Sequence, residues 1–183
     1  MASVTIKGLD KLTKQLADIP KATMEGAQKA NHATTEEIAS RAISNLQSST
    51  RHSSGAGGLA GEIKNESETI DGTPEGRVWV DSPIGTYREF GTGPVGEASQ
   101  KDLPDGVNPV YTQDPWLIPA DKVGADLNAL YGLPIWTIKG KKYYWTRGQP
   151  ARPFLYPAFK EVVADTQKWY EQEINKELKK VVK

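Results

Sequence analysis

A glycine-rich segment is the first place in this sequence where residue types and spacing match a known chemistry. Residues 91–96, Gly-Thr-Gly-Pro-Val-Gly, have the G-x-G-x-x-G spacing with which backbone amides hold nucleotide phosphates. That role requires a buried strand before the glycines and a helix after them. However, no apolar run precedes Gly91, Pro94 removes one backbone donor, and Pro104 with Gly106 ends a following helix early. The glycines therefore predict a turn rather than a phosphate site.

A second candidate site combines basic and aromatic side chains in residues 139–147, Lys-Gly-Lys-Lys-Tyr-Tyr-Trp-Thr-Arg. Aromatic rings stack on nucleic-acid bases, and Lys and Arg contact phosphates. The candidate DNA-facing residues are Lys139, Lys141, Lys142 and Arg147. The alternative is a β-hairpin whose lysines are solvated at its turn and whose rings divide between core and surface. We favour the hairpin, because the net charge is zero and no nucleic-acid-binding fold motif accompanies the cluster.

The residues offer little for catalysis or metal binding. The chain has no cysteine, which excludes disulfides, thiolate zinc sites and a cysteine nucleophile. Its two histidines, His32 and His52, lie in polar sequence without a supporting motif, and no carboxylate pair or metal cluster stands out. We therefore expect a protein that is not an enzyme and has no catalytic residues, cofactor or metal. A nuclease or peptidase that depends on one of the histidines is the remaining alternative.

Length and composition favour one compact domain with a small core. The chain has 183 residues, and Leu, Ile, Val and Phe make up only about one fifth of them. We expect a thin core, with polar segments or surfaces completed by other subunits. No apolar run approaches the ~18 residues that cross a bilayer, and the N-terminus lacks a signal peptide. Synthesis in the cytoplasm and no membrane contact are expected.

The N-terminal third predicts two helices. Leu9, Leu12, Leu16 and Ile19 recur at helical spacing, and Pro20 is expected to interrupt the helix they form. A second helix is predicted over residues 21–47, with a stripe of mostly small residues: Ala27, Ala30, Thr34, Ile38, Ala42 and Leu46. Small side chains allow close packing, and so long a helix suggests an exposed spine or a subunit contact.

The rest of the chain predicts two hairpins and a final helix. Residues 48–61 are rich in Ser and Gly and predict a loop. Residues 62–70 and 77–81 are strand candidates, joined by turn residues 71–76 into an antiparallel hairpin. Residues 93–133 predict a long excursion, residues 134–145 a second hairpin, and residues from Pro153 onward an amphipathic helix.

Four segments, in this order, resemble one protein family. They are residues 6–12 (IKGLDKL), leading into a long helix, residues 55–63 (GAGGLAGEI), residues 87–92 (YREFGT) and residues 151–158 (ARPFLYPA). The last two are close to the signatures "Tyr…Glu-Phe-Gly-Thr" and "Ala-Arg-Pro-Phe-Leu-x-Pro-Ala". The chain thus resembles the tail-completion proteins (head–tail joining or neck proteins) of long-tailed bacteriophages and prophages.

The resemblance implies a fold and a function. The fold would be α+β, a small antiparallel sheet flanked by a long N-terminal helix and a C-terminal helix, in a single domain of residues 1–183. The function would be structural: a hexameric ring in the neck of the virion, assembled in the host cytoplasm. Its partners would be the tail terminator or tube protein and the head-closure (connector) protein, with non-specific contact to genomic DNA in the lumen.

The two signatures suggest roles in maintaining the fold. They comprise Tyr87, Glu89, Phe90, Gly91, Thr92, Arg152, Pro153, Phe154 and Pro157. Phe90 is expected to anchor its segment in the core, and Gly91 permits a turn conformation that other residues resist. Arg152 is expected to pair with Glu89, because guanidinium groups suit a fixed carboxylate. Pro153 is expected in the first turn of the C-terminal helix, with Pro157 in or near it.

Many members of the family have a shorter link between the two signatures. By comparison, residues 93–145 resemble an insertion, which we expect to form an arm and a hairpin. Three tryptophans lie in it. Trp136 and Trp145 are expected to cover the sheet of their own subunit. Trp116, Leu117 and Ile118 follow a proline in an extended segment, and we expect them to reach a neighbouring subunit, because tryptophan is enriched at interface centres.

Overall fold

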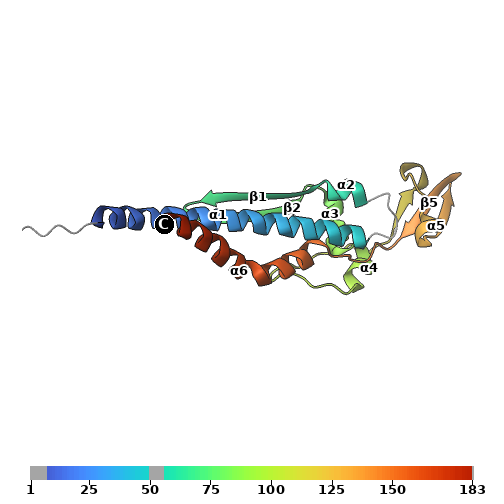
Figure 1. Cartoon of the computed structure of the whole chain (residues 1–183). Helices are drawn as coiled ribbons and strands as arrows, with labels where there is room; N and C mark the ends of the chain where they lie inside the picture. Colours follow the sequence, from blue (N-terminus) through green and yellow to red (C-terminus); the bar gives the residue numbers. More distant parts are fainter. Residues whose placement is uncertain (1–7, 50–55, 183) are drawn as a thin grey trace, which may run out of the picture.

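The computed structural model describes residues 8–49 and 56–182 and has an elongated shape built along one helix (Figure 1). A β-hairpin and the C-terminal helix both pack on this helix, and a second sheet lies at one end. The elements are α1 (Leu9–Ser48), α2 (Ala56–Ala60), β1 (Ile63–Ile70), β2 (Thr73–Val80), α3 (Pro83–Phe90), α4 (Gly93–Ala98), β3 (Trp116–Pro119), η1 (Ala120–Lys122), α5 (Leu127–Tyr131), β4 (Ile135–Ile138), β5 (Lys141–Thr146) and α6 (Leu155–Val181). The predicted α+β class is confirmed, with two small antiparallel sheets instead of one.

Helix α1 is continuous over 40 residues, about 60 Å at 1.5 Å per residue, so the predicted interruption at Pro20 is wrong. Proline removes a single helical hydrogen bond, the one to the carbonyl of Leu16. Both residues are exposed, so water can satisfy that carbonyl, and the helix continues through the proline.

The predicted stripe of small residues on α1 is buried, apart from Ala27, which is half-buried. Ala30, Ala42 and Leu46 have no exposed surface, and the core cluster joins this stripe to Leu59 and Phe154. The stripe therefore packs within the subunit, against the β1–β2 hairpin and α6.

Small residues also set how closely α6 approaches α1. A Cβ at Gly26 would lie 2.5 Å from the Cα of Ile174, so only glycine permits the two backbones to come this near. Further along, Glu177 of α6 is buried and accepts hydrogen bonds from Lys29 of α1 (2.5 Å) and Lys180 (2.7 Å). These bonds, from Lys180 first and then Lys29, lower the pKa of Glu177 from its ordinary value of 4.5 to about 2.

The first predicted hairpin is confirmed, with a tighter turn. Strands β1 and β2 pair in antiparallel register from Ile63 opposite Val80 to Ile70 opposite Thr73. Asp71 and Gly72 alone form the turn, with φ angles of 49° and 79°, the left-handed values of a two-residue hairpin turn. The predicted linker was too long, because residues 73–76 continue the strand.

The region predicted as an excursion carries its own structure. Helices α4 and α5 and strand β3 lie within residues 93–133, and β3, β5 and β4 form a three-stranded sheet in that order. The predicted second hairpin is confirmed as β4 and β5, which turn at Lys139 and Gly140. Residues 50–55 of the predicted Ser/Gly loop lie outside the described part of the chain, and the next five residues form α2.

Helix α6 begins two residues later than predicted. Phe154 precedes its first residue, so Pro153 lies outside the helix and Pro157 lies in its first turn. Within residues 8–49 and 56–182, we find no helix with the length and apolar character needed to cross a membrane.

Candidate functional site: a buried carboxylate beside an apolar groove

The structure brings the two signature segments together at the start of α6. Thr92 and Gln149 form an isolated antiparallel bridge, with backbone hydrogen bonds of 3.0 and 3.2 Å. The Arg152 amide donates to the Arg88 carbonyl at 2.8 Å. Segments more than 50 residues apart are thus joined through their backbones, which explains how short signatures can fix one junction.

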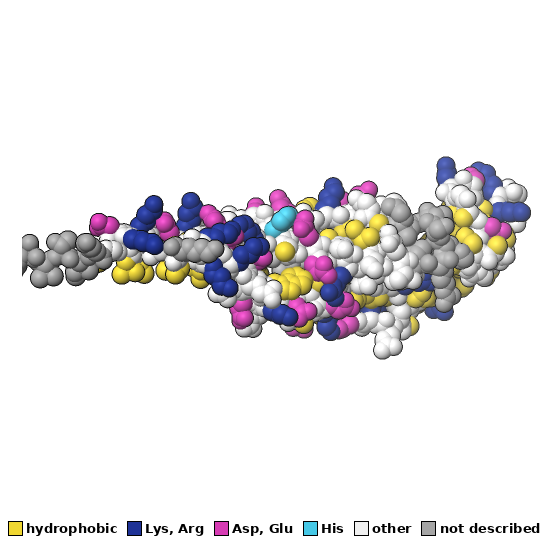
Figure 2. Space-filling model, viewed as in Figure 1, with side chains coloured by type: hydrophobic (Ala, Val, Ile, Leu, Met, Phe, Trp, Pro, Cys, Tyr) yellow, Lys and Arg dark blue, Asp and Glu magenta, His cyan; other side chains and the backbone are white. Residues whose placement is uncertain are grey.

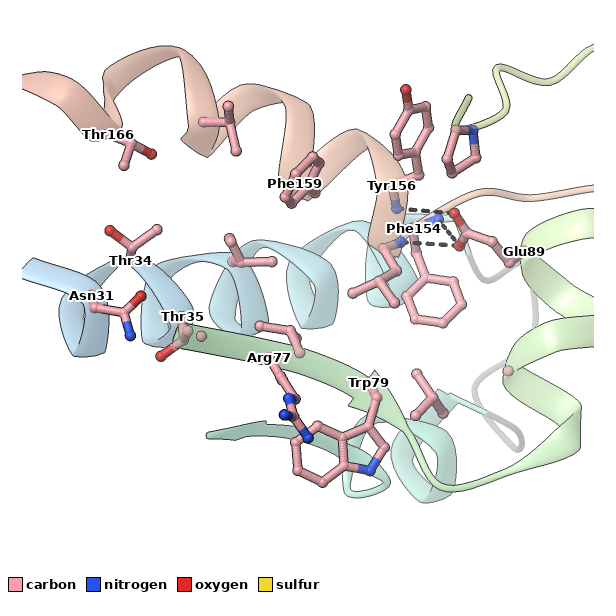
Figure 3. Close-up of a pocket in the computed structure, with 18 of the residues that line it drawn as sticks. Asn31, Thr34, Thr35, Arg77, Trp79, Glu89, Phe154, Tyr156, Phe159 and Thr166 are labelled. Atoms are coloured by element: carbon pink, nitrogen blue, oxygen red, sulfur yellow. Dashed lines mark hydrogen bonds between the residues drawn. The ribbon is translucent and has the colours of Figure 1, made fainter. Parts of the chain in front are cut away.

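Glu89 is the central side chain of this junction. It is 8% exposed, and Oε2 accepts the amides of Phe154 (2.8 Å) and Leu155 (3.0 Å), while Oε1 accepts that of Tyr156 (2.9 Å) (Figure 3). The next residue, Pro157, has no N–H. The first four amide positions of a helix have no partner within the helix. Here the carboxylate satisfies three of them and proline removes the fourth, and the negative charge lies at the positive end of the helix dipole.

The predicted ion pair between Glu89 and Arg152 is not formed. Both residues are in the described part of the chain, and no salt bridge joins them there. Backbone amides of α6 occupy both carboxylate oxygens instead. The Arg152 guanidinium, half-buried, lies near that of Arg88, whose pKa is lowered mainly by burial and further by the positive charge of Arg152.

The predicted turn in the G-x-G-x-x-G segment is formed at Gly91, whereas Gly93 and Gly96 lie in the short helix α4. Gly91 has φ 77°, and a Cβ there would lie 2.6 Å from Gly96 and 2.7 Å from the Ala151 amide. The amides of Thr92, Val95 and Gly96 donate to carbonyls of the chain. These three backbone donors, which a phosphate would otherwise use, are therefore engaged in holding the junction.

Of the signature residues, Phe90 is less buried than predicted. Phe90 is half-buried and is not part of the core cluster, so the prediction that it anchors its segment in the core is wrong. Phe154, 1% exposed, has that place. Tyr87 is exposed, and its carbonyl accepts a hydrogen bond from the Gln149 side chain (3.0 Å).

An apolar groove of about 740 Å³ opens beside Glu89. Its floor is α1, at Thr34 and Ile38, one wall is β2 and the other is α6 (Figure 3). Among the described residues that line it, only Arg77 and Glu89 are charged. The Glu89 carboxylate accepts hydrogen bonds from backbone amides of the α6 N-terminus, and a guanidinium nitrogen of Arg77 lies 3.2 Å from a carboxylate oxygen of Glu68 in the same hairpin. The groove therefore favours an apolar occupant.

Sequence reasoning did not find this groove. Phe159 and Val163, on its α6 wall, belong to the apolar pattern of the predicted C-terminal helix, and both are 46% exposed.

The candidate intersubunit residues form strand β3. Trp116, Leu117 and Ile118 are half-buried and pair with β5 of the same chain. The Trp116 ring lies beside Gly93, where a Cβ would be 3.1 Å from it. Contact with a neighbouring subunit stays a prediction. Trp145 is half-buried and stacks on Trp136, which is half-exposed, with ring centroids 6.3 Å apart.

Lys139, Lys141 and Lys142 lie at the turn of the β4–β5 hairpin, at the end of the molecule opposite the first turn of α1 (Figure 1). Arg147 instead follows β5 at the base of this sheet, where its carbonyl accepts the Val95 amide. Lys139, Lys141, Lys142 and Arg147 are exposed, and no salt bridge joins them to any described carboxylate. Residues 127–160 contain six basic residues and no Asp or Glu. The balanced charge of the whole chain conceals this local excess, which sequence reasoning missed.

The histidines and the carboxylates form no catalytic arrangement among the described residues. His32 is exposed on α1, 3.4 Å from Glu36, and His52 lies outside the described part of the chain. No group of three or more potential metal ligands occurs within residues 8–49 and 56–182.

Comparison of the chain with models of protein families, with curated proteins and with solved structures gave no match. The structure itself defines an elongated α+β protein with an apolar groove and a basic tip.

Proposed function

We propose that this chain is a structural protein of a phage neck, which completes the tail and joins it to the head as one subunit of a sixfold ring. The observation that supports this proposal is the junction between the two signatures. Their residues meet through backbone contacts and the helix-capping carboxylate of Glu89, as expected for motifs that maintain a shared fold.

The rest of the surface is consistent with a subunit that is completed by neighbours. The groove beside Glu89 is apolar and open, and exposed leucines lie along the N-terminal turns of α1. Large apolar patches on a subunit mark interaction sites. In the proposed neck, the neighbours are other copies of this chain, the tail terminator or tube protein and the head-closure protein, and genomic DNA passes through the lumen.

The proposal is tested by deleting the gene from the phage or prophage that carries it. We expect the protein in purified virions, and separate heads and tails in electron micrographs of the deletion lysate. Native mass spectrometry of the assembled neck should give six copies. Absence of the protein from virions, together with normal joining of heads and tails in the deletion, would refute the proposal.

A nucleic-acid-binding module is the second candidate, because the hairpin tip has a local basic excess with two stacked tryptophans beside it. This function predicts binding to short duplex or single-stranded DNA that weakens steeply with salt. Lys141→Glu with Lys142→Glu should abolish it. Lys14→Glu with Lys168→Glu, two exposed lysines on the helices, is the matched control. Equal loss in both variants would show only a general charge effect.

A further inference from the structure

The N-terminal turns of α1 present an apolar ridge that nothing covers in the described subunit. Leu9, Leu12 and Leu16 are 53%, 52% and 58% exposed, and Ile19 continues their line. Figure 2 shows hydrophobic side chains along one edge of this part of the molecule and charged ones along the opposite edge. We call residues 9, 12, 16 and 19 the leucine ridge. The i, i+3, i+7 spacing is that of a helix that docks in a groove.

From the ridge and the groove, we propose that the leucine ridge of one copy docks in the apolar groove of the next copy, head to tail. This deepens the proposed function, on which it rests for the closure of the ring at six copies. The groove cannot receive the ridge of its own chain. Both lie on α1, and 18 residues of continuous helix, about 27 Å, separate Leu16 from Thr34.

The two surfaces agree in length. The α6 wall of the groove runs from Tyr156 to Tyr170, about 21 Å, and the ridge from Leu9 to Ile19 is about 15 Å long. An uninterrupted helix is needed for such a ridge, and α1 provides it because Pro20 does not break the helix.

The two surfaces also agree in charge. On the helical projection, Thr13, Gln15 and Pro20 flank the ridge, and Lys14 and Asp18 lie on the opposite face. The groove has no free charge on its lining, since Arg77 and Glu89 are engaged within the subunit. Docking would therefore bury no unpaired charge, which is the main cost of burying a surface.

The contact area between the ridge and the groove is small, and this area determines how strongly two copies associate. Half the circumference of a helix about 15 Å long and ~10 Å wide covers on the order of 240 Å². Stable pairwise interfaces bury about 800 Å² per partner. Two isolated copies should therefore associate weakly and in a concentration-dependent way. A head-to-tail contact lets each copy use both surfaces, and closing a ring adds avidity.

Cysteine cross-linking tests the contact directly, because the chain has no cysteine of its own. Leu12→Cys with Val163→Cys, treated with a short bismaleimide at high protein concentration, should give a ladder of dimers, trimers and larger oligomers. Lys14→Cys with Val163→Cys is the matched control, since Lys14 lies on the face of the same helix turned away from the ridge. It should give no ladder.

Mixing two blocked variants tests the direction of the contact. Leu12→Glu with Leu16→Glu blocks the ridge, and Val163→Asp blocks the groove, so neither should self-associate. Their mixture should form a one-to-one dimer and nothing larger. Circular dichroism establishes that both variants remain folded, as expected for changes at exposed positions.

Three results would overturn the inference. Cross-linking of Leu12→Cys alone would indicate that two ridges pair with each other. Cross-linked dimers without larger species would indicate a closed pair of copies. A small apolar molecule bound in the groove of a monomeric chain would identify a different occupant. Failure of the inference is distinguishable from failure of the proposed function. A sixfold neck ring without these cross-links refutes only the inference, whereas a ladder from a protein that virions do not need refutes only the function.

Discussion

The capping carboxylate of Glu89 gives the sharpest test of how this fold is held together. Glu89→Ala removes the acceptor of three helix amides in one step, and the bond to the Phe154 amide is buried. Glu89→Gln keeps one oxygen, which can still accept two amides, but places an NH2 group against the third. The two variants thus separate the loss of all three hydrogen bonds from the loss of one bond and the charge.

The expected cost follows from the number of amides left without a partner. An unsatisfied buried donor costs about 1–3 kcal/mol, and a lost helix cap about 0.5–2 kcal/mol. Because water can reach part of the space that alanine opens, we expect Glu89→Ala to cost about 3–5 kcal/mol and Glu89→Gln about 1–2 kcal/mol. For a chain of this size, the alanine variant should lower Tm by roughly 10 °C.

Urea and thermal unfolding, followed by far-UV circular dichroism, measure these differences. Glu66→Ala is the matched control, an exposed glutamate on β1, and should change the free energy of unfolding by less than ~0.5 kcal/mol. If Glu89→Ala is no less stable than this control, the capping role is refuted. If Glu89→Gln is as unstable as the alanine variant, the charge matters more than the number of hydrogen bonds.

Three further predictions concern other contacts. Gly148→Ala would place a Cβ 1.8 Å from the Thr92 carbonyl oxygen and should lower the free energy of unfolding by more than ~3 kcal/mol. Gly140 also has a positive φ but has open space around it, so Gly140→Ala should lower that free energy by only about 1–2 kcal/mol. Equal losses in the two variants would contradict the close approach at Gly148. Gly26→Ala should lower Tm by forcing α6 away from α1, at about 1–3 kcal/mol, and an unchanged Tm would show that the helices move apart freely. The folded-state pKa of Glu177 is lowered to about 2, so the stabilisation from this carboxylate is complete above pH 4.5 and disappears as the pH falls toward 2. The Tm difference between the wild type and Glu177→Gln should therefore shrink over that window. A Tm difference that does not change with pH would contradict the assignment.

Local sequence patterns predicted the helices and strands well, because the formation of these elements depends mainly on residues close together in the sequence. The α1 stripe, the two hairpins and α6 follow from side-chain periodicity and turn residues, and all are present. Pro20 was misjudged because the rule for proline weighs the lost hydrogen bond without asking whether the site is exposed. A central, buried proline would interrupt a helix, but here solvent compensates.

The candidate site was predicted only in part, for a different physical reason. The two signatures were expected to meet, and they do. Arg152 was predicted as the partner of Glu89 because a sequence distinguishes residues by their side chains and gives no sign of which backbone amides are available. The actual partners are backbone amides, which every residue except proline has. Pro157 was the one available clue, since it marks a first turn with a missing donor. The groove could not be foreseen, because it depends on where α6 crosses α1, at Gly26.

The same junction explains how the second sheet is attached to the helical body. Residues 93–148 leave the body after Thr92 and return at Gln149, and these two residues pair with each other. Gly148, with φ 105°, brings the returning backbone against Thr92, where no side chain would fit. The segment is therefore closed at its base by the Thr92–Gln149 bridge, three residues along the chain from the Glu89 carboxylate that caps α6. A change in the length of this segment would be absorbed beyond the bridge, so the groove and the helix cap can stay intact while the basic tip varies.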